Sequence, residues 1–122
     1  MWIKIYDLKP IPKGRPRVNT KNLNVYTPKR TADYEEAVAW HYKKYDGTMH
    51  SGPLRLTVRF YFRGDKNKPH TKVPDLDNLL KALMDAINGV AWADDKQVTD
   101  IIASKHYADA DGIVFNVEEI DG

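Results

Sequence analysis

The sequence predicts an α+β fold, a small mixed or mostly antiparallel sheet with two main helices packed on it. Three observations favour this class. One ten-residue stretch alternates strictly between apolar and polar residues, two stretches have helical periodicity, and the predicted order is strand-helix-strand-helix-strand-strand. With 122 residues the chain is long enough for one modest core, so we expect a single domain over residues 1–122.

The first half of the chain supplies a strand, a helix and a second strand. Residues 2–8 are rich in β-forming side chains and predict the first strand. Thr31 is placed to cap a helix that runs to about Tyr45, and Asp46-Gly47 ends it. Four residues at helical spacing are expected to face the core: Tyr34, Val38, His41 and Tyr45. On that stripe we interpret His41 as a packed side chain rather than a ligand.

The second strand, residues 54–63, has the clearest pattern in the chain. Its apolar face comprises Leu54, Leu56, Val58, Phe60 and Phe62. Its other face comprises Arg55, Thr57, Arg59, Tyr61 and Arg63, and contact with nucleic acid or with water alone both remain open for it.

The second half of the chain begins with the central helix. An apolar stripe runs through Leu76, Leu79, Leu80, Leu83, Met84 and Ile87, with Asp75 suited to the N-cap and Asn88-Gly89 to the stop. Residues 98–107 and 112–120 predict two further strands. The turn at residues 108–112 predicts that these two strands form a hairpin.

Acidic residues lie at both ends of the central helix. Asp77, Lys81 and Asp85 stand four apart on its polar face, and Asp94-Asp95 follow the apolar run Val90-Ala-Trp-Ala93. One interpretation is structural: Asp75 caps the helix, and Asp77 forms a surface ion pair with Lys81. The other is that the apolar run docks into the core and directs the second acidic pair toward the first. Converging carboxylates repel one another unless a cation joins them.

The donor set indicates which cation would fit. Carboxylate oxygens suit Mg²⁺ or Mn²⁺, and the chain has no cysteine to offer a softer metal. A calcium loop is excluded, although Asp75-x-Asp77-Asn78 begins like one. Leu80 occupies the position that needs glycine, and Ala86 the position that needs glutamate.

Charge is distributed unevenly along the chain. The net charge is only +2, yet residues 1–72 carry 16 Lys and Arg against 6 Asp and Glu, while residues 73–122 carry 3 against 11. This asymmetry favours a protein that contacts a polyanion with one part and holds cations with another. Two basic loops are the expected phosphate contacts: Lys13, Arg15 and Arg17 in the first, and Lys68, His70 and Lys72 in the second, which leads directly into Asp75. His70 as a general base is the weaker alternative.

Three segments together resemble a known family. The run from Pro74 to Val98, PDLDNLLKALMDAINGVAWADDKQV, is similar to the signature of the RusA family of Holliday junction resolvases. Residues 12–17 (PKGRPR) and 26–31 (YTPKRT) also resemble segments common in that family. One departure is Pro74, where some relatives carry a basic residue; Lys72 is the candidate substitute.

The resemblance implies a RusA-like fold and a specific chemistry. It implies that Asp75, Asp77 and Asp95 bind Mg²⁺, for which Mn²⁺ can substitute, with Lys81 supporting the scissile phosphate. Asp95 fits the family pattern better than Asp94. It further implies a homodimer that cuts a four-way DNA junction by paired phosphodiester hydrolysis in DNA recombination and repair.

Two other functions remain open from the residues. One is a non-catalytic nucleic-acid-binding module, and the other is a nuclease that acts on RNA or on other branched DNA such as flaps. The sequence has no signal-peptide pattern and no apolar run of membrane length. We therefore expect no membrane partner and a cytoplasmic protein. The resemblance to the RusA family further implies a gene from a bacterium or a phage.

Overall fold

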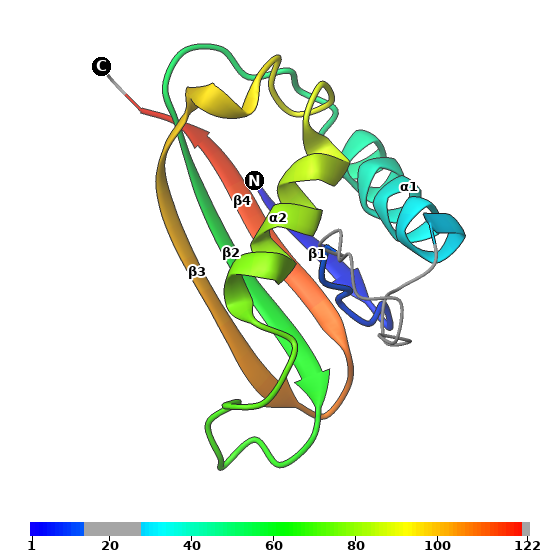
Figure 1. Cartoon of the computed structure of the whole chain (residues 1–122). Coiled ribbons are helices and arrows are strands. Elements are labelled where there is room, and N and C mark those ends of the chain that lie inside the picture. The colour runs from blue at the N-terminus through cyan, green and yellow to red at the C-terminus, as the bar shows by residue number, and fades with distance from the viewer. Residues whose placement is uncertain (14–27, 121–122) are drawn as a thin grey trace, which may run out of the picture.

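The structure, a computed structural model, describes residues 1–13 and 28–120 (Figure 1). Its elements in chain order are β1 (Trp2–Tyr6), α1 (Pro28–Tyr45), β2 (Leu54–Arg63), α2 (Leu76–Ile87), the short 3₁₀ helix η1 (Asp95–Gln97), β3 (Val98–Ala108) and β4 (Gly112–Glu119). The predicted α+β class and the order of strands and helices are confirmed. Only η1 was not expected.

The four strands form one mixed sheet in the order β1-β4-β2-β3. β2 pairs antiparallel with β4 and parallel with β3, and β1 pairs antiparallel with β4. The predicted hairpin of β3 and β4 is therefore wrong, because β2 lies between them. The end of β2 is fixed there by the turn after β3: the Gly64 amide donates to Ala108 O (3.0 Å) and the Arg63 amide donates to Asp111 Oδ1 (2.9 Å).

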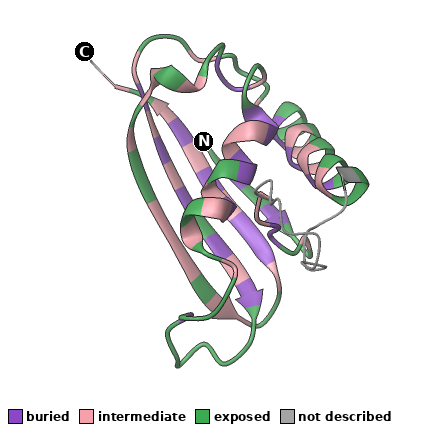
Figure 2. Cartoon of the chain, viewed as in Figure 1, coloured by how far each residue is buried: buried purple, intermediate pink, exposed green. Residues whose placement is uncertain are grey.

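Both helices pack on the same face of this sheet (Figures 1 and 2). All five apolar residues of β2 face them and are buried, as predicted, together with inward residues of β1 and β4. From α2, the fully buried side chains include Leu79, Leu83 and Ile87. Alternation with a period of two thus gives the sheet one covered face and leaves the other face without a helix in the part of the chain that the structure describes.

Helix α1 ends at Tyr45 as predicted, but its start and one of its core positions differ from the expectation. It begins at Pro28, three residues before the predicted cap at Thr31, because proline is well accommodated in the first turn of a helix. Tyr42 occupies the core position expected for Tyr45, which is exposed. Tyr34, Val38 and Tyr42 are separated by four residues each, so they stay on one side of the helix. His41 is partly buried, with Nδ1 2.8 Å from Ala37 O.

Helix α2 ends as predicted and is followed by a buried return. Asn88 is the C-cap and Gly89 has a positive φ of 79°, which glycine adopts without strain. Ala91 and Trp92 are then fully buried. The predicted docking of this apolar run into the core is confirmed. In the described residues, no helix is both long and apolar enough to cross a membrane.

Candidate active site

The first acidic group lies at the N-terminus of α2. Asp75 occupies the predicted N-cap position, with φ −69° and ψ 143°, but its side chain makes no capping hydrogen bond. Its backbone carbonyl accepts from the Leu79 amide (3.1 Å). The structural interpretation of the Asp75 side chain is therefore wrong, and its exposed carboxylate is available for another role.

Asp77 and Lys81 follow on the exposed side of α2. They are one turn apart, yet no ion pair joins these two described residues, so the expected surface pair is not formed. The Lys81 ammonium is left facing solvent beside the N-terminal carboxylates. A positive group one turn from two carboxylates is suited to neutralising the charge of a bound phosphate.

Lys105 of β3 fixes the backbone that leads into Asp75. Its ammonium donates to Lys72 O (2.6 Å) and Pro74 O (2.9 Å), on either side of a cis peptide bond between Val73 and Pro74. The side chains of Lys68 and Lys72 are exposed on the same loop, as the sequence predicts for phosphate contacts. Lys105 therefore ties the loop that carries Asp75 to the edge strand of the sheet.

The second acidic group lies in and before η1, where Asp94 and Asp95 have different roles. Asp94 is the N-cap: its Oδ1 accepts from the Lys96 amide (2.9 Å). Asp95 instead accepts at Oδ1 from Nε1 of the buried Trp92 (2.8 Å). One Asp95 oxygen is therefore oriented by a rigid indole, and no bond within the described residues is recorded for the other. Of the two, Asp95 is the carboxylate suited to a metal.

Gln97 holds this turn in place, and its role was not predicted. Its Oε1 accepts from the amides of Ala93 and Asp94 (both 3.0 Å), and its Nε2 donates to Gly52 O (3.2 Å) and lies 3.5 Å from His50 O. One amide side chain thus joins the turn that carries Asp95 to the segment that leads into β2. Only an amide offers both an acceptor and two donors for such an arrangement.

We expect Gln97→Ala to destabilise the protein by about 1–3 kcal/mol, because two backbone amides and a carbonyl lose their partner. Chemical denaturation followed by circular dichroism measures this change. Lys96→Ala is the control, since Lys96 is exposed next to it and its side chain makes no recorded bond. Equal stability of Gln97→Ala and Lys96→Ala would contradict the role assigned to Gln97.

The two acidic groups lie at opposite ends of α2. The helix has 12 residues and rises about 18 Å. Strand β3 gives a second measure of the separation. Its Lys105 donates to Pro74 O next to Asp75, and its Val98 follows η1, which contains Asp95. The part of β3 from Val98 to Lys105 spans roughly 23 Å. Figure 1 shows the same separation, with η1 and the start of α2 at opposite ends of the helix layer. Within one chain, Asp95 does not converge with Asp75 and Asp77 as expected, and no group of three or more described His, Asp or Glu residues is placed to hold a metal.

The Lys13 ammonium, which the sequence predicts as a phosphate contact, is paired with two carboxylates. It lies 2.8 Å from Glu35 Oε1 and 3.2 Å from Asp85 Oδ2, and the Lys13 amide donates to Asn78 O (3.0 Å). The hydrogen bond to Glu35 raises the pKa of Lys13, with smaller contributions from Asp85. Lys13 therefore joins α1 to α2. The other residues expected in that loop, Arg15 and Arg17, lie outside the described residues.

His70, which the sequence also predicts as a phosphate contact, is buried in the structure. Its ring is stacked on Tyr107 at a centroid distance of 4.4 Å, with Phe62 at 4.8 Å. Burial lowers the pKa of His70, and nearby Lys105 lowers it further, which favours the neutral ring. His70 anchors its loop by packing, and neither the phosphate contact nor the alternative of a general base is supported.

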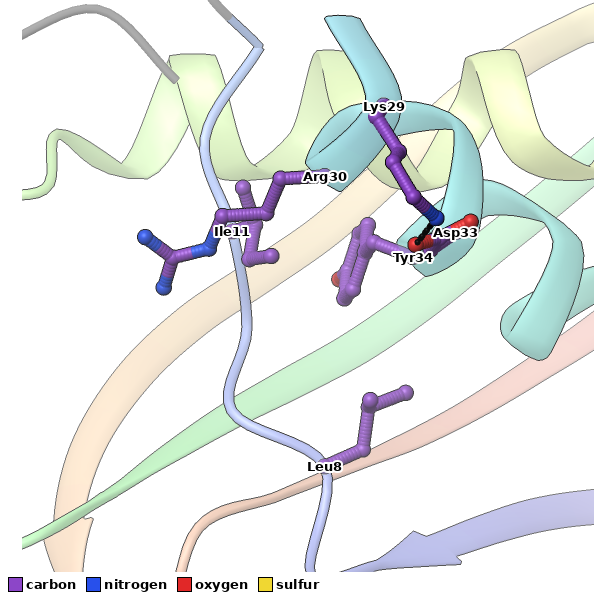
Figure 3. Close-up of a pocket in the computed structure, with 6 residues that line it drawn as sticks. All are labelled: Leu8, Ile11, Lys29, Arg30, Asp33 and Tyr34. Atoms are coloured by element: carbon purple, nitrogen blue, oxygen red, sulfur yellow. Dashed lines mark hydrogen bonds and ion pairs between the residues drawn. The ribbon is translucent and has the colours of Figure 1, made fainter. Parts of the chain in front are cut away.

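A separate hollow of about 350 Å³ opens at the start of α1 (Figure 3). Its lining is Leu8, Ile11, Lys29, Arg30, Asp33 and Tyr34. The one carboxylate in it, Asp33, is already paired with Lys29 at 3.0 Å. This hollow therefore offers no free carboxylate for the chemistry that the two acidic groups suggest.

Sequence reasoning missed two residues that position the acidic groups, Gln97 and Lys105, and it predicted the burial of Trp92 without its hydrogen bond to Asp95. For Lys105 a signal exists, because a lysine falls at an inward-facing position of the predicted strand between Ala103 and Tyr107. For Gln97 there is a partial signal, because Asp94-x-x-Gln97 has the spacing of a capping box. Its bond to Gly52 has none, since that partner lies more than 40 residues earlier.

Comparison with known proteins identifies the family of this chain. The chain is 28% identical over 131 aligned residues to YqaN of Bacillus subtilis (strain 168), itself described as an uncharacterized protein, and the alignment covers 92% of each chain. Residues 7–118 match the model of the family described as endodeoxyribonuclease RusA. This match includes both acidic groups and almost the whole fold. The chain therefore belongs to the RusA endodeoxyribonuclease family of Holliday junction resolvases.

Proposed function

We propose that the protein is a Mg²⁺-dependent, structure-selective endodeoxyribonuclease that resolves four-way DNA junctions by paired phosphodiester hydrolysis, in DNA recombination and repair. The observation that carries this proposal is the state of two carboxylates in the family's signature segment. Asp75 occupies a cap position without capping, and Asp95 is oriented by the Trp92 indole. Neither arrangement is needed for the stability of α2, whereas both suit metal ligands.

The proposed ligands are Asp75, Asp77 and Asp95, with Mn²⁺ able to replace Mg²⁺. Their all-oxygen donor set fits a hard divalent cation. When bound, such a cation activates a water molecule and stabilises the charge that develops on the scissile phosphate. Lys81 adds a positive charge beside that phosphate, and Trp92 keeps Asp95 in one orientation before the substrate arrives.

Because one chain holds the two acidic groups far apart, we propose that a homodimer brings them together. In this arrangement Asp75, Asp77 and Lys81 of one protomer face Asp95 of the partner subunit. A two-fold axis then generates two identical sites, as the two opposed cuts in a four-way junction require. The fit of these residues to a metal is thus a property of the dimer.

The outer edge of β3 is the surface that favours this dimer. β3 is an edge strand of 11 residues, and its outer edge is covered near His106 by a bridge to Pro69. Ile101 and Ile102 are 40% and 57% exposed on opposite faces of the sheet. Only a second chain that lies alongside β3 covers both isoleucine side chains. Exposed apolar edge strands are templates for pairing with another chain.

The exposed Ile102 also sets the register, because residues directly opposite each other in an antiparallel pair lie on the same face of the sheet. Antiparallel pairing about a two-fold axis at Ile102 places Val98 opposite the partner's His106, next to the partner's Lys105. Each η1 directly precedes Val98, and each Lys105 binds the backbone next to Asp75. The same pairing therefore carries Asp95 of one protomer to the Asp75 end of its partner.

The direct test is cleavage of a synthetic four-way junction by the wild type and by Asp77→Asn. We expect the variant to lose nicking almost completely, by at least 1,000-fold, because a ligand to the metal is removed while the shape of the side chain is kept. Junction binding is retained or strengthened, since one carboxylate no longer repels the phosphates.

Asp33→Asn is the matched control, because it removes a carboxylate from the exposed side of α1. Linear duplex, flap and RNA substrates are cut in parallel, and equal rates on duplex and junction would remove the claim of structural selectivity. Cleavage that is unchanged in Asp77→Asn would overturn the proposed site.

A further inference from the structure

The face of the sheet away from the helices is open in the described part of the chain. Its residues form rows across the four strands, because the register aligns them. One row comprises Trp2, Asn116, Thr57 and Ile102. The next comprises Lys4, Val114, Arg59 and Ser104. The third comprises Tyr6, Gly112, Tyr61 and His106.

Four rings lie on this face, in addition to the aromatic residues of the core: Trp2, Tyr6, Tyr61 and His106. Trp2 is 43% and Tyr6 74% exposed, although neither supports the packing of a helix. The Tyr61 and His106 rings lie 5.6 Å apart at an angle of 31°. In the third row, Gly112 separates Tyr6 from Tyr61 without a side chain of its own, because a Cβ there would come within 2.9 Å of the Ile5 carbonyl oxygen of β1.

Cations lie between the rings. The Arg59 guanidinium sits over the Trp2 ring, 5.7 Å from its centroid. Among the described residues no carboxylate pairs with the side chains of Lys4, Arg59 or Arg63. Arg55, at one end of the face, holds the carboxylates of both Asp100 and Glu118. At the other end, Asp111 accepts from the Arg63 backbone amide, and Asp109 pairs with Lys66. The centre of the face is thus positively charged and aromatic.

We propose that this open face binds unpaired nucleotides of DNA, with bases stacked on the rings and phosphates bound by the cations. An open sheet face with separated rings suits the planes of single bases, which are buried inside a duplex. Free arginine and lysine side chains complement phosphates, whereas a protein partner would favour a contiguous apolar patch. This surface is distinct from the proposed cleavage site, because Asp75 and Asp77 belong to the helix layer on the other side of the sheet.

The test is the affinity for a fluorescently labelled oligothymidylate, measured by anisotropy in EDTA so that no cleavage occurs. We expect Trp2→Ala to weaken binding about tenfold, because stacking of one base on an aromatic ring is lost. Trp2→Phe keeps a ring and should restore most of the affinity. Arg59→Gln should lower the slope of log affinity against log salt concentration by about 0.7, the value for one phosphate contact in a single strand.

Trp40→Ala is the matched control. Trp40 is 53% exposed on α1 with the Lys44 ammonium 4.8 Å from its ring centroid, so it offers the same ring and cation on the helix layer. We expect less than a twofold change. Equal effects at Trp2 and Trp40, or a Trp2→Ala variant that alters the mass of the assembly and leaves DNA affinity unchanged, would overturn the proposal. Because these measurements involve no metal, their outcome is independent of the cleavage test.

Discussion

An equimolar preparation of Asp77→Asn and Asp95→Asn, each inactive alone, is expected to recover about a quarter of the wild-type rate of junction nicking. In the proposed two-fold dimer, one site of a mixed dimer combines both substitutions and the other site has neither. Random association makes about half of the dimers mixed, and half of the sites in each are intact. About a quarter of all sites therefore remain active.

The measurement is nicking of a labelled four-way junction after the two variants have been co-expressed with different tags. Because each mixed dimer has one working site, the product should be a singly nicked junction, with little paired resolution. The mixture of Asp75→Asn with Asp77→Asn is the control: both substitutions fall in the same half of the site, so a mixed dimer has no intact site and no activity returns. Failure of the first mixture to recover activity, with mixed dimers present, would place each site within one chain.

The separation of the two acidic groups explains which part of the site the sequence could predict. Asp75, Asp77 and Asp95 stand out because of residue type and context, and the burial of Trp92 follows from its apolar neighbours. The sequence did not exclude convergence within one chain. Residues 88–94 number seven, and an extended segment of that length spans about 24 Å, enough to run back along α2. Instead Ala91 and Trp92 are buried near the C-terminal end of α2. The segment therefore packs into the core there and does not run back along the helix.

In the fold, too, local sequence patterns predict the helices and strands, whereas they do not predict which strands pair. Strand β2 and helix α2 match their predicted bounds because each buries one regularly spaced set of apolar residues. The order of strands does not follow from such patterns. β2 carries the longest apolar alternation, and the structure places it inside the sheet, where it separates the two strands that the sequence predicted as a hairpin.

The basic residues show that composition does not predict which side chains are accessible to a phosphate. Lys13 and His70 each stand in a basic stretch, which favours phosphate binding in a sequence. In the structure a lysine beside Glu35 and Asp85 becomes a link between helices, and a histidine between Phe62 and Tyr107 becomes a packed ring. Both outcomes depend on residues far away in the chain, so composition alone could not separate them from the exposed Lys68 and Lys72.

Ile102→Lys is expected to convert the protein to a folded monomer and to lower Mg²⁺-dependent junction nicking by at least 100-fold. In the proposed antiparallel pairing, residue 102 lies at the two-fold axis opposite the partner's Ile102. Two lysines then approach each other there, and a charge on an edge strand opposes pairing with a second strand. The monomer keeps its fold because Ile102 is 57% exposed and lies outside the buried core.

Three measurements on the same sample separate the consequences of Ile102→Lys. Sedimentation equilibrium reports the mass, which is 14.0 kDa for one chain. Urea unfolding reports the fold, and calorimetric titration with Mg²⁺ reports the metal site. We expect the heat of Mg²⁺ binding to disappear together with the dimer, because neither half of the site has three carboxylate ligands of its own.

Met49→Lys is the control for added charge, since Met49 is similarly exposed, at 52%, and lies outside β3. It should remain dimeric and active. A monomeric Ile102→Lys protein that still binds Mg²⁺ and cuts the junction would refute the shared site, because a single chain would then suffice. A variant that stays dimeric and active would instead refute the β3 edge as the interface, and leave the mixing experiment to decide whether the two acidic groups meet across another surface.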